Sequence, residues 1–483
     1  MNNISTQRVS KGFFWKLLER FGVSGTQFVL QIILARLLSP EHYGVLSIMV
    51  IFTTLANVFI QQGFNTALIQ NKDVTEEDYS SVLWISLGIA TVLYGAIYVT
   101  SPLIGIFYNM PDIVTPMRVL ALMLFPGALN SVQLAKISRE MDFKKVFFSN
   151  VGGVVISGVI GIAIAYMGGG LWALVVQHLL HVVVVCIVMR FTVHLRIKLN
   201  IDWERVRTLF SYGWKLLASS LLDTLYQDLR SLVIGKKFDS GTLGYYNRGK
   251  QFPQFMINAV NGTIQSVMLP AMSAEQDNRT KVKNMMRTSI NMSAYVILPM
   301  MAGLAAVAEP LITLLLTDKW LPCVPYMQVY CFTFAFYPVH SCNLQAINAM
   351  GRSDLFLKLE IIKKTYGIIA LVIAVLCFDS PLAIAMTGLI TTWIGWFVNS
   401  WPNKKLLGYS MKEQMVDLVP SMIMSVVMAG CVLLIGMIEI HVLLKLVLQI
   451  IVGIVAYLFM SAIVKPEAYK MLISRVSGIM KRK

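Results

Sequence analysis

Long stretches without a charged residue are the feature of this sequence that most constrains its fold. Residues 81–107, 146–167 and 171–189 contain no Asp, Glu, Lys or Arg, and about 20 largely apolar residues suffice for a helix to cross a bilayer. Over all 483 residues, 56% are hydrophobic and 14% are charged, whereas a soluble domain has about 25% charged residues. The alternation typical of β-barrel strands is absent, which leaves helices as spanning elements. The sequence therefore predicts an all-α polytopic membrane protein.

The hydropathy pattern predicts about 14 transmembrane helices. Most of the 41 Lys and Arg residues fall in segments that would lie on one side of the membrane. Because positively charged loops face the cytoplasm, this asymmetry predicts that both termini are cytoplasmic. The net charge of +16 then orients the chain and requires no nucleic acid partner. The expected spans are residues 12–36, 43–70, 81–107, 113–135, 146–167, 171–189, 213–235, 251–272, 288–316, 323–349, 359–378, 381–401, 416–437 and 446–464.

The two halves of the chain repeat one pattern. WKLL occurs at residues 15–18 and again at 214–217, and Gly44 and Gly244 lie 200 positions apart in similar turns. Each half holds six expected spans, an even number, so both repeats have the same orientation. Transporters built from such parallel repeats bind substrate between the repeats, near the middle of the bilayer. Three further pairs keep a constant offset of 212: Pro126 and Pro338, Gln133 and Gln345, and Asp142 and Asp354.

The repeat predicts two parallel six-helix lobes around a central cavity. The N-terminal lobe is expected at residues 1–190 and the C-terminal lobe at 213–405, joined by a basic cytoplasmic linker at 191–212. Residues 406–483 have no counterpart in the repeat, so they are expected to add two helices and a basic cytoplasmic tail. Pro126 and Pro338 are expected to kink their helices.

Ionisable residues within the expected spans mark a candidate binding site. A charged group at mid-bilayer costs roughly 2.5–3.5 kcal/mol on insertion scales and usually faces a bundle interior or a watery cavity. Four polar residues at i, i+3, i+4 and i+7 share one helix face: Asp223, Tyr226, Gln227 and Arg230. Arginine suits an anionic ligand because its planar fork binds phosphate oxygens bidentately. The substrate-binding candidates are Arg20, Gln27, Gln31, Arg118, Lys215, Tyr226, Gln227 and Arg230.

Carboxylates in the same helices are candidates for ion coupling. A buried carboxyl group with a raised pKa takes up and releases protons, which would couple transport to a gradient. The candidates are Glu19, Asp223 and Asp228. The alternative is structural, with Asp223 or Asp228 neutralising a basic residue of an adjacent helix. For Lys215 we favour snorkelling to the interface, and Arg118 is as easily an anchor near the end of its span.

Sequence motifs for catalysis and for cofactor binding are missing. The chain contains no GxxxxGK[ST] loop, and neither HExxH nor GxSxG occurs. Its six cysteines form no CxxC pair. For His178 and His181, which lie at i and i+3, we expect interhelical hydrogen bonds rather than metal ligation. The sequence therefore predicts no enzyme, no cofactor and no metal site.

Several segments resemble the polysaccharide transporter family. They occur in this order along the chain: ARLLSPEHYGVLSI, GFNTALIQNKDVTEEDYSSVLWISL, REMDFKKV, LGYYNRGKQFPQF, VMLPAMS and DKWLPCVPYMQ. The resemblance reaches to about Lys412 and is to Wzx-type oligosaccharide flippases and teichuronic acid or lipopolysaccharide exporters of the multidrug/oligosaccharidyl-lipid/polysaccharide (MOP) superfamily. It implies two six-helix lobes around a cleft, an oligosaccharide on a polyprenyl diphosphate as cargo, and transport driven by ions.

Residues and resemblance together predict a secondary transporter of the cytoplasmic membrane that flips a lipid-linked oligosaccharide or polysaccharide unit by alternating access. The expected partners are this substrate, membrane lipids and other polysaccharide-assembly proteins. The nearest alternative is a multidrug exporter of the same superfamily, whose cationic cargo calls for fewer arginines. A membrane polymerase or glycosyltransferase would need a sizeable loop with acidic or His residues, and a scaffold would not need charged helices in both halves.

Overall fold

The structure, a computed structural model, describes Trp15 and residues 22–62, 64–70, 74–195, 197–199 and 201–480. Every regular element in these ranges is a helix. Nine helical segments of the described chain are long and apolar enough to cross a membrane. The chain is thus an all-α, multi-pass membrane protein, as the sequence predicts, and the number of 14 spans stays a prediction.

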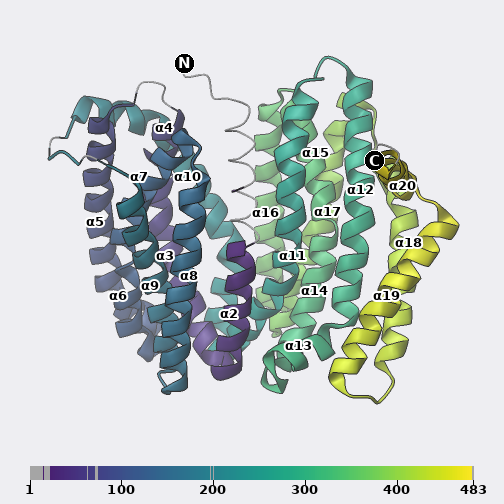
Figure 1. Cartoon of the computed structure of the whole chain (residues 1–483), viewed down its shortest axis with the longest axis horizontal. Coiled ribbons are helices and arrows are strands. Elements are labelled where there is room, and N and C mark those ends of the chain that lie inside the picture. Colours follow the sequence, from purple (N-terminus) through teal and green to yellow (C-terminus); the bar gives the residue numbers. More distant parts are fainter. Residues whose placement is uncertain are drawn as a thin grey trace. The chain divides into compact units, whose positions relative to one another are not determined.

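The chain divides into two compact units, Met1–Gly244 and Tyr245–Lys483. Figure 1 labels their helices. Those of the first unit are α2 (Ser24–Leu37), α3 (Pro40–Gln61), α4 (Phe64–Gln70), α5 (Glu76–Tyr108), η2 (Pro111–Ile113), α6 (Val114–Ala121), α7 (Leu124–Glu140), α8 (Phe143–Tyr166), α9 (Leu171–Thr192) and α10 (Trp203–Lys237).

Helix α11 (Ser240–Ser273) begins at the end of the first unit and continues into the second. The remaining helices of the second unit are α12 (Arg279–Ala306), α13 (Ala308–Leu316), η3 (Asp318–Cys323), α14 (Val324–Ala335), α15 (Tyr337–Ala349), α16 (Ser353–Cys377), α17 (Pro381–Leu407), α18 (Met411–Gly436), α19 (Val442–Val464) and α20 (Glu467–Met480).

Both repeats break one helix beside the matched proline. Helices α6 and α7 part at Leu122 and Met123, because in an uninterrupted helix the ring of Pro126 would clash with the Leu122 carbonyl four residues earlier. In the second repeat, α14 and α15 part at Phe336, two residues before Pro338. The predicted kinks are therefore confirmed.

Helix α10 starts at Trp203, ten residues before the predicted span at 213–235. The Asp202 carboxylate caps it by accepting hydrogen bonds from the backbone N–H groups of Glu204 and Arg205, each at 3.1 Å. The second half of the expected linker is therefore helical. Since α10 packs on α3, α4 and α5, it belongs to the first compact unit. The division into lobes at residue 212 rests on the repeat and stays a prediction.

The segment between α9 and α10 is held against the acidic first turn of α5. Lys198 Nζ lies 2.7 Å from Glu77 Oε1, and its backbone N–H donates to Ser80 Oγ at 2.9 Å. Trp84 Nε1 donates to the Lys198 carbonyl at 2.9 Å. Nearby, Lys136 Nζ of α7 lies 2.7 Å from Glu76 Oε1. These contacts dock the connecting segment on one end of the first unit.

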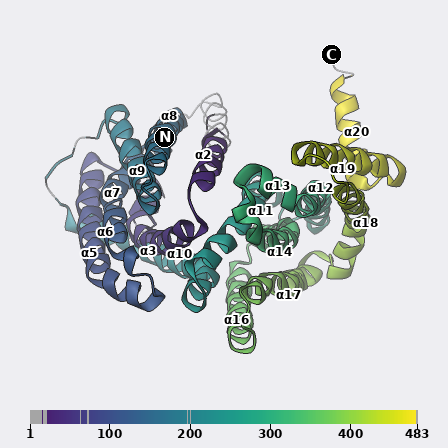
Figure 2. The same ribbon diagram turned by 90° about the horizontal axis from the view of Figure 1, so that it is seen from below.

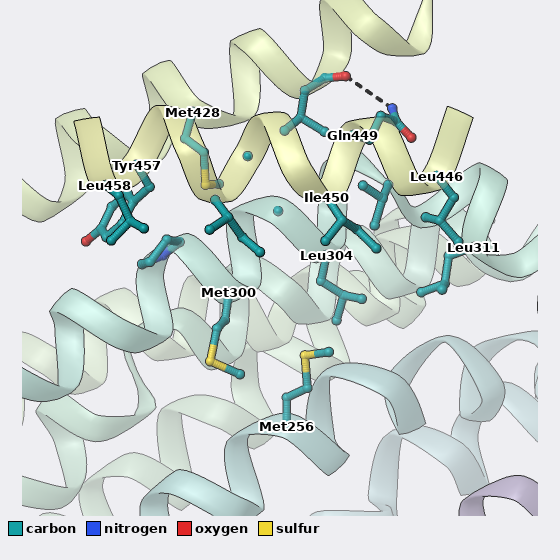
Figure 3. A pocket seen from close by; sticks show the side chains of 16 residues that line it. Met256, Met300, Leu304, Leu311, Met428, Leu446, Gln449, Ile450, Tyr457 and Leu458 are labelled. Atoms are coloured by element: carbon teal, nitrogen blue, oxygen red, sulfur yellow. Dashed lines mark hydrogen bonds between the residues drawn. The ribbon is translucent and has the colours of Figure 1, made fainter. Parts of the chain in front are cut away.

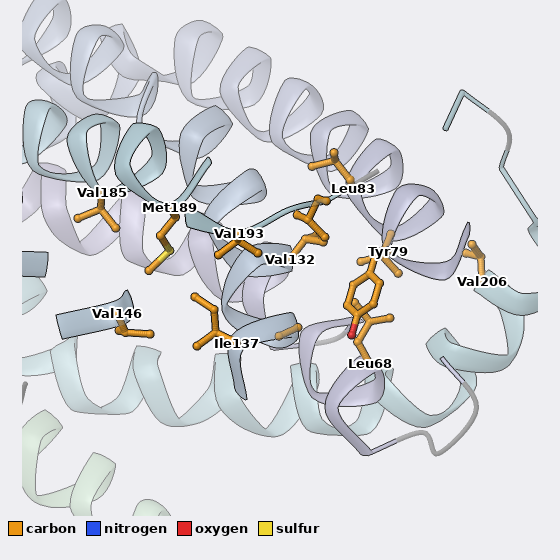
Figure 4. Packing of buried hydrophobic residues seen from close by; sticks show 13 residues of the cluster. Leu68, Tyr79, Leu83, Val132, Ile137, Val146, Val185, Met189, Val193 and Val206 are labelled. Carbon is orange, nitrogen blue, oxygen red and sulfur yellow. The ribbon is translucent and has the colours of Figure 1, made fainter. Parts of the chain in front are cut away.

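The core of the first unit lies where α4, α5, α7, α8 and α9 meet. Figure 4 shows Leu68 of α4 beside Tyr79 of α5, with Val146 of α8 and Val185 of α9 at the other end of the same cluster. Helices α8 and α9 of this core run side by side.

The matched glycines Gly44 and Gly244 pack against each other's turn. A Cβ built on Gly44 would lie 1.7 Å from the Ser240 carbonyl oxygen, and one on Gly244 would lie 2.1 Å from the Pro40 carbonyl oxygen. Only glycine permits two backbones to approach this closely. The two turns that the sequence repeat aligns are therefore in direct backbone contact.

Helix α18 is fastened to the rest of the second unit by polar contacts at its start. The Arg287 guanidinium of α12 makes two hydrogen bonds to the Asp417 carboxylate, at 2.8 and 2.6 Å. Tyr409 donates to the same carboxylate at 2.7 Å, and burial together with this hydrogen bond raises the pKa of Tyr409. One turn earlier on α18, buried Gln414 exchanges hydrogen bonds of 3.0 and 3.1 Å with buried Asn343 of α15. The added helices are thus part of the second unit's packing.

Candidate functional site

The polar residues predicted on one face of a helix lie within α10. Because α10 is continuous from Trp203 to Lys237, the spacing of Asp223, Gln227 and Arg230 places them on one face. Gln227 Nε2 donates a hydrogen bond of 2.7 Å to Asp223 Oδ2. Asp223, Tyr226 and Arg230 are half-buried, and Gln227 is exposed. This face joins a carboxylate, an amide, a phenol and a guanidinium within two helical turns.

The remaining candidates on α10 occupy different surroundings. Asp228 is half-buried, one position past Gln227, and so points to another side of the helix. Lys215 is exposed, three turns before Tyr226 and toward the start of α10. Exposure of its ammonium group agrees with the snorkelling expected for this lysine.

Helix α2 carries the candidates of the first repeat. Gln27 is exposed and Gln31 is 8% exposed, so the two amides, one turn apart, differ in burial. Arg20 and Glu19 lie outside the described residues. Of the stripe predicted from Arg20 to Gln31, the structure therefore describes the two glutamines.

Arg118 is bound to α5. Its Nε donates to Ser101 Oγ at 3.0 Å and to the Tyr98 carbonyl at 3.3 Å. Its guanidinium also lies 3.9 Å from the centroid of the Tyr98 ring, a cation–π geometry. These contacts fasten α6 to α5, which matches the anchoring alternative for this residue.

An apolar pocket of about 420 Å³ lies in the second unit, between α11, α12, α13, α18 and α19. Figure 3 shows Met256 and Met300 on one side and Ile450 and Tyr457 on the other. The lining residues are Met256, Pro299, Met300, Gly303, Leu304, Val307, Leu311, Met428, Val432, Leu446, Gln449, Ile450, Gly453, Ile454, Tyr457 and Leu458.

The Gln449 amide and the Tyr457 hydroxyl of this apolar pocket both donate hydrogen bonds within the protein, whereas Gln449 Oε1 is buried without a partner in the described structure. Gln449 Nε2 donates to the Val432 carbonyl at 3.1 Å, as the dashed line in Figure 3 shows. The Tyr457 hydroxyl donates to the Tyr295 carbonyl at 2.8 Å. The remaining surface is hydrocarbon and thioether, and methionine side chains adapt to irregular apolar ligands. Such a pocket suits a flexible hydrocarbon chain.

The sequence contains no local signal for this pocket, because its wall comes from five helices. Two glycines of the lining, Gly303 and Gly453, come nearest to such a sequence signal. A Cβ on Gly303 would lie 3.6 Å from Met428 Cε, and a Cβ on Gly453 would lie 3.1 Å from Val432 Cγ2. Small residues at these positions keep the space open, but glycines in membrane helices most often mark close packing.

The chain is similar in sequence to proteins of polysaccharide biosynthesis. The family model for "Polysaccharide biosynthesis protein" matches residues 33–325. The teichuronic acid biosynthesis protein TuaB of Bacillus subtilis (strain 168) is 24% identical over 357 residues, which are 72% of this chain and 73% of that protein. The lipopolysaccharide biosynthesis protein WzxC of Escherichia coli (strain K12) is 22% identical over 421 residues, 85% of this chain and 84% of that protein.

Solved structures share the fold. The lipid II flippase MurJ in an inward closed conformation superposes with a TM-score of 0.72 at 17% identity, over 97% of this chain and all of that one. An inward-facing multidrug resistance transporter of the MATE family, in the MOP superfamily, gives a TM-score of 0.61 at 16% identity, over 81% of this chain and 98% of that one. At these identities the likeness establishes the fold.

Proposed function

This chain belongs to the polysaccharide biosynthesis protein family, and from that premise we propose that it is a secondary transporter which moves a lipid-linked oligosaccharide or polysaccharide unit across the cytoplasmic membrane by alternating access. The observation that carries the proposal is the apolar pocket of about 420 Å³, whose wall offers hydrocarbon and thioether groups. A lipid carrier has a long hydrocarbon chain, and a pocket of this chemistry accommodates such a chain better than a polar solute.

The polar face of α10 supplies the second requirement, which is to bind the head of the substrate. A polyprenyl diphosphate is anionic, and the guanidinium of Arg230 can donate two parallel hydrogen bonds to phosphate oxygens. Tyr226 and Gln227 offer a hydroxyl and an amide to sugar hydroxyl groups. Arg20, which lies outside the described residues, remains a candidate for the same role in the first repeat.

Ion coupling is assigned to the carboxylates of α10. Gln227 donates a hydrogen bond to Asp223, which ties the amide that contacts substrate to the carboxylate that would carry the ion. Protonation or cation binding at Asp223 would change this hydrogen bond and so the shape of the face. Asp228 is the second candidate, and Glu19 lies outside the described residues.

The orientation in the membrane follows from the basic loops. Lys136, Arg139, Lys144 and Lys145 surround the turn between α7 and α8, and we place this turn, with both termini, on the cytoplasmic side. Substrate would then be loaded from the inner leaflet, where membrane-bound enzymes assemble lipid-linked sugars. Other polysaccharide-assembly proteins are the partners expected on that side.

Deletion of the chain tests the proposal. Lipid-linked sugar on each leaflet is measured in cells that lack the protein and in cells that express the wild type, Arg230→Ala or Arg279→Ala. Arg279 is exposed at the start of α12 and is the matched control. We expect inner-leaflet accumulation without the protein, relieved by the wild type and the control but not by Arg230→Ala. If no lipid-linked sugar accumulates in the deletion strain, the proposed cargo is wrong, and a drug-sensitivity screen becomes the next step.

A further inference from the structure

A second pocket, of about 240 Å³, lies inside the first unit between α3, α7, α8 and α9, beside the α6–α7 break. Its character differs from that of the apolar pocket, since polar and apolar side chains alternate around it. The polar members are Asn57, Gln61, Asn130, Ser131, Asn150 and His181, and the others are Met123, Gly127, Leu134, Val146, Val182, Val185 and Met189. We call it the amide pocket.

Two polar atoms of residues that line the amide pocket are buried without a hydrogen-bond partner in the described structure, Asn57 Oδ1 and Asn130 Oδ1. The third polar side chain, His181, turns its Nδ1 toward α8, where a Cβ built on Gly153 would lie 3.0 Å from it. Asn130 is held in place because its Nδ2 donates to the Val182 carbonyl at 3.2 Å, which leaves its oxygen for another donor. Buried polar groups in proteins are almost always hydrogen-bonded, because an unpaired one forfeits its hydration. Something that donates hydrogen bonds must therefore occupy this space.

The charge of the lining narrows the class of ligand. Among the described residues that line the amide pocket there is no Asp, Glu, Lys or Arg, so neither a phosphate nor an ammonium group finds a counter-charge there. A neutral ligand with hydroxyl donors satisfies the amide oxygens of Asn57 and Asn130 without a counter-charge. The apolar half of the lining would face the C–H groups of the same ligand.

The volume of the amide pocket narrows the class of ligand further. At about 240 Å³, the amide pocket is smaller than the roughly 300–1,000 Å³ of sites for drug-sized ligands, so it holds one ring rather than an oligosaccharide. It lies near the end of the unit where α3 and α9 finish and α8 begins, as the positions of Gln61, Met189 and Val146 show. That is the end assigned to the cytoplasmic side, where substrate is loaded.

We propose that the amide pocket binds one neutral pyranose ring through Asn57 and Asn130, and that it selects against uronate and phosphorylated sugars. This inference rests on the proposed function and names the class of sugar that the transporter accepts on its loading side.

Two substitutions test the amide pocket. Gly127→Leu fills it, because a Cβ on Gly127 already lies 3.4 Å from Asn57 Oδ1. Asn57→Ala removes one acceptor and leaves the space open. Gly95→Leu is the matched control, since Gly95 is exposed on α5 with no atom within 4 Å of its built Cβ.

Saturation-transfer NMR on the full chain in nanodiscs gives the readout, with methyl glucoside, methyl galactoside and N-acetylglucosamine as neutral probes and glucuronate and glucose 6-phosphate as anionic ones. All samples carry Arg230→Ala in addition, so that the polar face of α10 does not bind the anionic probes. We expect transfer to at least one neutral probe, at least tenfold weaker transfer to the anionic ones, no transfer in Gly127→Leu and an affinity about 2- to 10-fold weaker in Asn57→Ala. Gly95→Leu should match the wild type.

Three results would overturn the inference. One is no transfer to any neutral probe, which means that the pocket holds water only. Another is equal transfer to the anionic sugars. The third is full transfer in both Asn57→Ala and Gly127→Leu. If Gly127→Leu does not fold, as judged by gel filtration, Asn57→Ala decides. The proposed function fails separately, by the absence of lipid-linked sugar accumulation in the deletion strain.

Discussion

At the scale of single residues, Arg230 carries the proposed recognition of the anionic head group. Arg230→Ala should lower transport about 10- to 100-fold, because hydrogen bonds to a charged group are worth roughly 1.5–3 kcal/mol. Arg230→Lys should recover only part of the activity, since lysine keeps the charge but loses the planar fork. Transport rates of purified variants in vesicles measure this. Full activity in Arg230→Ala would remove this residue from the site.

A substitution at Gly303 tests whether the apolar pocket binds the hydrocarbon chain of the substrate. Gly303→Leu places a side chain in the space that Met428 and Ile450 border, and it should weaken binding of a long-chain prenyl diphosphate by tenfold or more without changing binding of a short-chain analogue. Gly95→Leu is again the control. Equal binding of both chain lengths by Gly303→Leu would show that the hydrocarbon chain lies elsewhere.

Only part of the candidate site could be predicted from single residues. The shared face of Asp223, Gln227 and Arg230 follows from helical periodicity, and α10 supplies that periodicity. The fate of Arg118 does not follow from its neighbours in sequence. Its partners Ser101 and Tyr98 lie 17 and 20 positions away and reach it only because α5 and α6 pack together. The amide pocket could not be predicted for the same reason, since its lining residues Asn57, Asn130 and His181 lie on three helices that only the fold brings together.

At the scale of elements, the backbone contact between the two matched turns can be tested by substitution. Gly44→Leu should abolish correct folding, because the Ser240 carbonyl lies where its Cβ must go and a backbone cannot rotate aside as a side chain can. Overpacking usually costs about 1–3 kcal/mol, and the expected loss here is larger. The measurement is the yield of monodisperse protein in detergent, with Gly95→Leu as control. Normal yield and melting temperature for Gly44→Leu would contradict the backbone contact.

Hydropathy predicts where helices lie better than where they begin. The interruptions at Leu122 and Phe336 could be predicted because proline acts locally. The early start of α10 could not, because Asp202 acts as a cap within a segment that is polar and basic throughout. The apolar pocket is also beyond prediction from the elements alone. Its wall is a product of how α11, α12, α13, α18 and α19 pack together.

At the scale of the whole molecule, the family and the fold agree with the internal repeat, and a lipid-linked substrate sets one chemical requirement. The protein must move an amphiphile whose two ends need different surroundings. The second unit contains an apolar pocket that suits a hydrocarbon chain, and the first unit contains the polar face of α10, which carries Arg230. A carrier of cationic drugs would have no use for an arginine on that face.

The most direct measurement is flipping by the purified protein. Vesicles containing the full chain receive a fluorescent prenyl diphosphate oligosaccharide in both leaflets, and a membrane-impermeant quencher reports the fraction that reaches the outer leaflet under an imposed ion gradient. We expect the quenched fraction to rise with time in wild-type vesicles, to rise far more slowly with Arg230→Ala, and to stay constant without protein. A quenched fraction that does not change in wild-type vesicles, with either a proton or a sodium gradient, would contradict the proposed function.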